Sequence, residues 1–363
     1  MSQFSLVAVL SKPVLAVALL ASACAPQRAV PEQPAAPAAP AQQPAAGAQA
    51  APSYPKMTLK FNHVVTRDTP KGKAADRFAE LVKQRSGGNI EVQVFPNSEL
   101  YKDGEEIEAL QQGAVHFIAP GTDKLGVLVP AWEAPVLPGI FLSEEAGNRF
   151  AEPGNPVAKE LLDKLREKGM AGLGVWLNGF KHFTSSKRPL INPDDFKGQK
   201  FRTSGKPDEA FVKAMGSSAQ VMAFSEVFGA LQQGVVDGQF NTPSNILTQK
   251  FHEVQKYGTI SRGGVVLLYA VATNAKWWDG LDPATRKLLG DAMDDATRFN
   301  NQVAGEDNKS ALDAIKKSGR IELHEQTEAE AKAWAVAGEQ VLKEWEPRTG
   351  KDIIEKLKSL NNR

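Results

Sequence analysis

The residues best suited to binding chemistry lie between Phe196 and Asn245. Arg202 stands at the exit of a short strand predicted over residues 200–202, and the loop that follows would expose its side chain. A guanidinium group offers a carboxylate a planar fork with two charge-assisted hydrogen bonds. Asn241, which lies beside a glycine-containing turn, carries an amide that both donates and accepts. These residue types can hold a carboxylate without reacting with it.

Each of these residues also has a purely structural interpretation. Arg202 could form a surface ion pair with Asp195 or Glu209, and Asn241 could be a turn residue, as asparagine commonly is. Lys181 ends an apolar strand and would add a second cation that lacks the arginine fork. A solvated lysine is the alternative there. Two facing cations would suit a dicarboxylate, or one carboxylate held twice.

The motifs that usually carry catalysis are missing from the chain. It has no G-x-S-x-G, P-loop, G-x-G-x-x-G or H-E-x-x-H string, and its five histidines lack metal-ligand spacing. Cys24 is the only cysteine, so thiol chemistry is not expected in the folded part. The sequence therefore predicts a binding protein with no catalytic residue, metal or cofactor.

The size and charge of the chain narrow its class further. With 363 residues, of which 42% are hydrophobic and 23% charged, it has ordinary globular composition and room for two domains. Its formal net charge of +1 gives no electrostatic argument for a nucleic-acid partner. Nucleic acid is therefore not an expected partner.

The N-terminal region has the composition of an export signal followed by a tether. Residues 14–23 form an apolar run, too short to span a bilayer, that ends in small residues before Cys24. The run Leu20-Ala-Ser-Ala-Cys24 looks like a bacterial lipobox, so we expect a signal peptide over residues 1–23 and a lipid on Cys24. An ordinary secretory peptide cleaved beside the cysteine is the alternative. Residues 24–53, rich in alanine and proline, would form a semi-extended tether.

Strand and helix signals alternate from Tyr54 onward. A β-α-β-α-β series up to residue 119 is typical of a mostly parallel sheet covered by helices. Apolar residues keep helical spacing over 282–315, which predicts an unusually long helix. Thr327 and Glu330 fit a capping box and predict the start of a last helix.

An internal echo supports a two-domain plan. Residues 109–115 (ALQQGAV) return as 230–236 (ALQQGVV), and each copy ends a helix at a glycine and enters an apolar strand. The second copy belongs to a helix predicted over residues 226–233, with Ser225 as its cap. One such unit per lobe would explain the repeat. Coincidence is the alternative, because helix-glycine-strand joints are common.

Several strings along the chain resemble one protein family. They include KGQKFR at 197–202, FSEVFGALQ at 224–232, VVDGQFNTP at 235–243 and NGFKHFTSSKRPL starting at Asn178. Together, and in order, they resemble the extracytoplasmic solute-binding subunits of tripartite ATP-independent periplasmic (TRAP) transporters, of the C4-dicarboxylate-binding type. The resemblance covers nearly all of the chain from Thr58 to Leu342.

The resemblance implies an α/β fold with two lobes, similar to class II periplasmic binding proteins. Each lobe would be a mixed sheet covered by helices, with crossing strands between the lobes and the long helix spanning both. We expect lobe I to comprise residues 55–178 and 267–306. Lobe II would comprise residues 179–266 and 307–346, followed by a C-terminal tail at 347–363.

The resemblance also assigns roles to individual residues. It implies that Arg202 grips the carboxylate of the ligand and that Asn241 contacts the same group. Phe224 would line the pocket, although a core position is equally compatible with its place before a helix. His63, at the end of the first strand, would contact the distal end of the ligand, with a structural role as its alternative. At Lys181 some relatives carry an arginine that gives a second carboxylate contact.

The implied function is capture of a small organic acid in the interlobe cleft and its delivery to TRAP membrane subunits. A C4-dicarboxylate such as succinate or malate is the expected ligand, and a monocarboxylate such as a 2-hydroxy or 2-oxo acid is the competing choice. We expect a monomer in the periplasm, held at the membrane only by its lipid. A sensor protein that reports ligand to a signalling receptor is the alternative function, and a hydrolase on a binding-protein scaffold is a further one.

Overall fold

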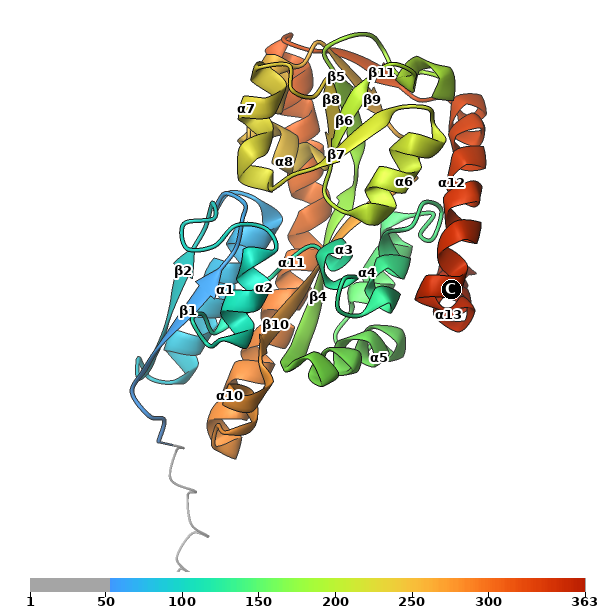
Figure 1. Ribbon diagram of the computed structural model, residues 1–363. Helices are drawn as coiled ribbons and strands as arrows, with labels where there is room; N and C mark the ends of the chain where they lie inside the picture. Colours follow the sequence, from blue (N-terminus) through green and yellow to red (C-terminus); the bar gives the residue numbers. More distant parts are fainter. Residues whose placement is uncertain (1–52, 363) are drawn as a thin grey trace, which may run out of the picture. The chain divides into compact units, whose positions relative to one another are not determined.

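The computed structural model describes residues 53–362 and folds them into two sheets covered by helices (Figure 1). Both sheets are mixed, as predicted, and belong to the two lobes. The predicted signal peptide, Cys24 and all of the tether except Ser53 lie outside the described residues. Within residues 53–362 no helix combines the length and the apolar character needed to cross a membrane.

The sheet of lobe I has five strands in the order β2-β1-β3-β10-β4. Strands β2, β1 and β3 run parallel, and β10 runs antiparallel to both of its neighbours. The bounds are β1 Met57–Asn62, β2 Ile90–Phe95, β3 Phe117–Ile118, β4 Met170–Phe180 and β10 Val266–Asn274. The first three strands therefore end at one edge of the sheet, where side chains from their loops can meet.

Helices cover both faces of this sheet. Helix α1 begins after Thr69, whose side chain accepts the amide hydrogen of Gly72, and Pro70 occupies its first turn. Its buried face includes Phe78, which packs edge-on against Phe61 and Phe117. The helices of lobe I are α1 Pro70–Arg85, α2 Glu105–Gln111, α3 Thr122–Leu125, α4 Glu144–Ala151, α5 Pro156–Lys164 and α10 Ala275–Asp279.

The sheet of lobe II has six strands in the order β11-β9-β5-β8-β6-β7. Strand β5 runs antiparallel to both neighbours, and the outer pairs are parallel. Its strands are β5 His182–Ser185, β6 Lys200–Thr203, β7 Ser218–Val221, β8 Gly238–Asn241, β9 Tyr257–Ile260 and β11 Glu322–Glu325. The helices beside it are α6 Lys206–Ala214, α7 Val227–Gln232, α8 Pro243–Thr248 and α9 Phe251–Val254.

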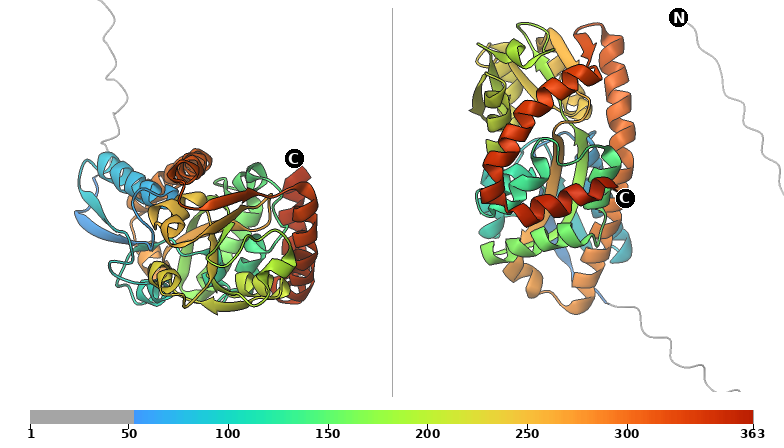
Figure 2. Two further views of the ribbon diagram at one scale, coloured as in Figure 1. Left: turned by 90° about the horizontal axis from the view of Figure 1, so that it is seen from above. Right: turned by 90° about the vertical axis from the view of Figure 1, so that its right-hand side faces the viewer.

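Two crossing segments and one long helix join the lobes. Lys181 alone separates β4 in the first sheet from β5 in the second, and residues 261–265 link β9 back to β10. Helix α11, Pro283–Ser318, packs on α1 and β4 of lobe I and on α8 of lobe II. Figure 2 shows it, in orange, running beside both lobes. The predicted long helix and crossing strands are therefore present.

The C-terminal region folds back across the molecule. Helix α12, Glu328–Thr349, begins at the predicted capping box of Thr327 and Glu330. Helix α13, Lys351–Ser359, occupies most of the segment expected as a tail. Its residues Ile353, Ile354 and Leu357 are buried, because they share a helix face that packs against α5 and the 3-10 segment Pro130–Val136 of lobe I.

One local prediction is wrong. Ser225 does not cap a helix starting at Glu226, because residues Phe224–Glu226 form a 3-10 turn and α7 begins at Val227. The chain turns early here because the amide of Phe224 donates a hydrogen bond to the carboxylate of Asp103 in lobe I. The two residues are 121 positions apart in the sequence, so no local pattern predicts this contact.

Candidate ligand-binding site

Arg202 lies near the end of β6 with only 3% of its surface exposed. Its Nε and Nη2 donate to the carbonyl oxygen of Met222, at 3.3 and 3.1 Å. The alternative surface pairs do not form: Asp195 accepts the amide hydrogens of Ile191 and Asn192, and Glu209 pairs with Lys213. Within residues 53–362 nothing accepts a hydrogen bond from Nη1, so part of the guanidinium fork remains available.

Arg202 is surrounded by an aromatic ring and by acidic side chains. The guanidinium carbon lies 5.7 Å from the ring centre of Phe224. Burial lowers the pKa of Arg202, and the negative charges of Asp103, Asp208 and Asp123 partly offset that effect. Phe224 is buried and packs edge-on against Phe251. It is therefore a core residue and also contacts the guanidinium group of Arg202.

Asn241 closes strand β8 beside β5. Its Oδ1 accepts from the amide of Thr242 at 3.0 Å and from Nδ2 of Asn245 at 2.8 Å. These two hydrogen bonds occupy the side-chain oxygen and hold the side chain in place. Its own Nδ2 makes no hydrogen bond within the described part of the chain, which leaves Asn241 as a donor toward the adjoining space.

Lys181, the single residue between β4 and β5, is buried in an ion pair. Its Nζ lies 2.9 and 2.7 Å from the two carboxylate oxygens of Asp208, and both side chains are almost completely buried. Asp208 also accepts from the hydroxyl of Ser204 at 2.5 Å. The ring of Phe240 lies 4.9 Å from the same Nζ. The solvated-lysine alternative is therefore wrong, and a carboxylate of the protein already balances this cation.

A cavity of about 40 Å³ brings four of the five predicted ligand residues together. It lies between the lobes, because Val64, Val65 and Asp103 come from lobe I and Arg202 from lobe II. The lining residues are Val64, Val65, Asp103, Gly121, Asp123, Lys124, Lys181, Arg202, Ser204, Phe224, Phe240, Asn241, Asn245, Leu267 and Tyr269. Cations and hydrogen-bond donors from separate elements thus converge on one small cavity between the lobes.

His63 is the predicted residue that does not line this cavity. It is fully buried next to the lining residue Val64, and its ring packs edge-on against Phe61. Neither ring nitrogen has a hydrogen-bond partner among the described residues. Burial holds the pKa of His63 well below its usual value, and the charges of Lys71 and Arg67 lower it further. The imidazole is therefore neutral at physiological pH.

The cavity contains acidic residues that the sequence analysis missed. Asp103 and Asp123 follow the carboxyl ends of β2 and β3, the edge where ligands bind in α/β sheets, and this position was the available signal. Burial alone would raise the pKa of Asp123, but the charges of Lys124 and Lys181 outweigh it and lower the pKa. Asp123 also lies close to Gly205 of lobe II, where a Cβ atom would approach its Oδ2 to 2.5 Å.

A buried pair of opposite charges lies behind Tyr269, one of the lining residues. The Nζ of Lys71 is 3.7 Å from the ring centre of Tyr269 and donates to the carbonyl of Ala119 at 3.0 Å. Burial lowers the pKa of Lys71 and raises that of Glu106, each to about 8, while each charge partly stabilises the other. Buried charged groups of lobe I therefore lie directly behind one wall of the cavity.

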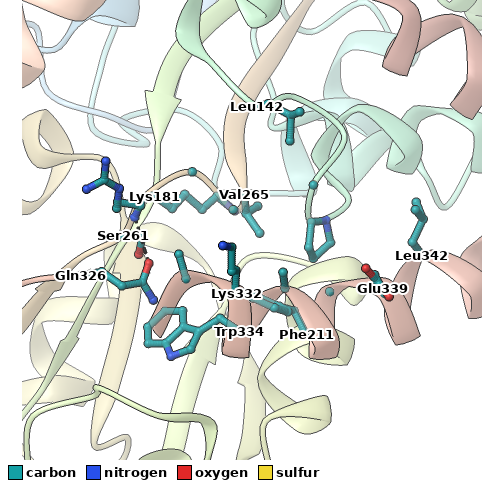
Figure 3. A pocket seen from close by; sticks show the side chains of 18 of the residues that line it. Leu142, Lys181, Phe211, Ser261, Val265, Gln326, Lys332, Trp334, Glu339 and Leu342 are labelled. Atoms are coloured by element: carbon teal, nitrogen blue, oxygen red, sulfur yellow. Dashed lines mark hydrogen bonds between the residues drawn. The ribbon is translucent and has the colours of Figure 1, made fainter. Parts of the chain in front are cut away.

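A larger pocket of about 450 Å³ lies on the other side of Lys181 and Phe240, which line both spaces. Figure 3 shows Lys181 and Val265 on one side of it and Trp334 and Phe211 on the other. Its walls are mainly apolar, and the free donors of Arg202 and Asn241 do not face it. The charged cavity, although smaller, is therefore the candidate for an anionic ligand. No group of three metal-ligating side chains occurs within residues 53–362.

The chain is similar to known solute-binding proteins. Residues 61–348 match the family model of bacterial extracellular solute-binding proteins, family 7 (DctP). The C4-dicarboxylate-binding periplasmic protein DctP of Rhodobacter capsulatus is 47% identical over 305 residues, which is 84% of this chain and 90% of that protein.

Solved structures of TRAP periplasmic solute-binding proteins are also similar. The protein from Shewanella oneidensis with bound succinate has 38% identity and a TM-score of 0.80 over 85% of this chain and all of that one. The protein from Pseudomonas aeruginosa with bound L-malate has 34% identity and a TM-score of 0.75 over 79% of this chain and 99% of that one. The predicted two-lobed fold is confirmed, as is the prediction of a binding protein rather than an enzyme. The chain belongs to family 7 of the bacterial extracellular solute-binding proteins, which includes the TRAP solute-binding proteins.

Proposed function

We propose that this protein captures a C4-dicarboxylate or a related small carboxylate in the cavity between its lobes. Arg202 carries the proposal, because it is buried at the cavity wall and its Nη1 has no acceptor within the described residues. A buried cation with a free donor strongly favours a carboxylate, since a charge-assisted hydrogen bond also fixes the orientation of the ligand. The named ligands of relatives, succinate and L-malate, are of this class.

Asn241 and Lys181 would complete the carboxylate site. The Nδ2 of Asn241 is a neutral donor on the strand next to β6, so it can share one carboxylate with Arg202. Lys181 has its charge balanced by Asp208 and offers only a remaining N–H. Phe224 would exclude water beside the guanidinium group, and His63 would support the wall formed by Val64 rather than contact the ligand.

The wider role proposed is delivery of the ligand to TRAP membrane subunits. The lobes would close over the ligand, and the closed form would be the one recognised by the membrane partner. The energy of transport would come from an ion gradient across those subunits, so the binding protein needs no nucleotide site. We further propose a periplasmic monomer exported by residues 1–23 and anchored through a lipid on Cys24, which mass spectrometry of the mature N-terminus would test.

Calorimetric titration of the purified protein tests the ligand class. Succinate and L-malate are titrated in parallel with lactate and pyruvate, which carry a single carboxylate. We expect saturable 1:1 binding of the dicarboxylates and binding at least tenfold weaker for the monocarboxylates. Tighter binding of a monocarboxylate would reverse the proposed ligand class, and absence of binding by all four would contradict the proposal as a whole.

A further inference from the structure

A short loop of lobe I, residues 101–104, contacts lobe II beside the cavity that Asp103 lines. There Asp103 accepts a 2.6 Å hydrogen bond from the backbone amide of Phe224 in lobe II. Beside it, Lys102 pairs with Glu226 at 3.0 Å, with about half of each side chain exposed. Figure 1 shows α7, which follows this segment of lobe II, facing the region of lobe I that carries α1 and α2.

The segment of lobe II held by Asp103 also holds Arg202. Met222, two residues before Phe224, accepts both hydrogen bonds that Arg202 makes. The ring of Phe224 lies against the same guanidinium group. A carboxylate of lobe I therefore fixes the backbone on which the ligand-binding arginine of lobe II rests. Separation of the lobes would break the Asp103 contact and free this backbone.

We propose that Asp103 is a positioning residue that couples contact between the lobes to the orientation of Arg202. This inference rests on the proposed function, because it assigns Arg202 to the ligand. It does not concern the ligand's own contacts. Asp103 would act only when the lobes meet, so it would slow ligand release without speeding ligand capture.

Electrostatic repulsion of the ligand by Asp103 would have the opposite effect. Asp103 lines the cavity, and a carboxylate near the site of an anionic ligand should repel that ligand. Neutralising Asp103 would then tighten binding and raise the association rate constant, because long-range attraction governs encounter. If Asp103 instead positions Arg202, its neutralisation must weaken binding and raise the dissociation rate constant. The sign of the change separates the two roles.

The experiment measures succinate binding to wild type, D103N and D103A by calorimetry and stopped-flow fluorescence. We expect D103A to raise Kd on the order of tenfold or more, since it removes a charged acceptor from a backbone amide. D103N should have a smaller effect, because its amide oxygen can still accept. Asp68, an exposed acid of lobe I, provides the matched control D68N, which should bind like wild type. An unchanged or lower Kd in both Asp103 variants would overturn the inference.

A second measurement does not depend on succinate. Spin labels on cysteines introduced at exposed Glu91 and Gln233, one in each lobe, report the distance between the lobes in a C24S chain. D103A should shift the distance distribution to longer values relative to the parent, while K102A should shift it little because its ion pair is exposed. An identical distribution in D103A would contradict the inference. Failure of wild type to bind any C4-dicarboxylate would contradict the proposed function alone.

Discussion

At the scale of single residues, the site is a balance of buried charges. Three cations and two carboxylates line the cavity, namely Arg202, Lys181, Lys124, Asp103 and Asp123, and Asp208 pairs directly with Lys181. In the proposed site, a ligand carboxylate would therefore enter a region that already contains carboxylates of the protein. Arg202 and Asn241 both keep a donor without an acceptor in the described structure and form no ion pair there, which is why they form the centre of the proposed site.

The buried pair of Lys181 and Asp208 gives a sharp stability prediction. D208A should lower the free energy of unfolding by about 3–5 kcal/mol, because it leaves the ammonium group buried without its partner. D194A is the matched control, since Asp194 pairs with Lys197 at an exposed surface and should contribute less than about 1 kcal/mol. Urea unfolding measures both values, and similar losses in the two variants would contradict the assigned burial.

His63 predicts how stability depends on pH. Its pKa is depressed in the folded protein, so below about pH 6.5 the unfolded chain binds a proton that the folded one does not. Stability should therefore fall as the pH drops below 6.5, by up to about 1.4 kcal/mol per pH unit for this group. H63Q should flatten the curve between pH 6.5 and 5, and H324Q, at a partly exposed histidine, should not. Parallel curves for H63Q and wild type would contradict the burial account.

At the scale of elements, the sequence predicts periodic segments well and contacts between distant segments poorly. The capping box at Thr327 and the length of α11 are both local patterns, and both are present. The pairing of Lys181 with Asp208 and the contact of Asp103 with Phe224 join separate elements. Such contacts depend on the assembled fold, so neither could be predicted from spacing.

Helix α13 lies in the segment expected as a tail, and its buried residues Ile353, Ile354 and Leu357 follow a helical spacing. L357A should destabilise the protein by about 2–5 kcal/mol, because this fully buried side chain would leave a cavity against lobe I. E355A, two residues away on the exposed face of the same helix, should change stability by less than about 0.5 kcal/mol. Thermal or urea unfolding compares them. A negligible loss in L357A would mean that residues 347–363 behave as the expected tail.

At the scale of the whole molecule, the site depends on both lobes. The sheets meet at Lys181 and at residues 261–265, and the cavity lies between them with walls from each. Helix α11 packs on both lobes, and its Asp307 pairs with Lys73 of α1 at 2.7 Å. Motion about the two crossing segments would therefore change the cavity while leaving each sheet intact, the behaviour expected of hinged binding proteins.

The calorimetric affinity of Arg202 variants for succinate tests the central claim most directly. R202A should lose at least a hundredfold in affinity, since a buried charge-assisted contact is worth about 3 kcal/mol or more, and R202K should recover only part of it because lysine lacks the fork. R320A, which removes an exposed arginine of lobe II, should bind like wild type. Equal succinate affinity in wild type and a folded R202A variant would contradict the account.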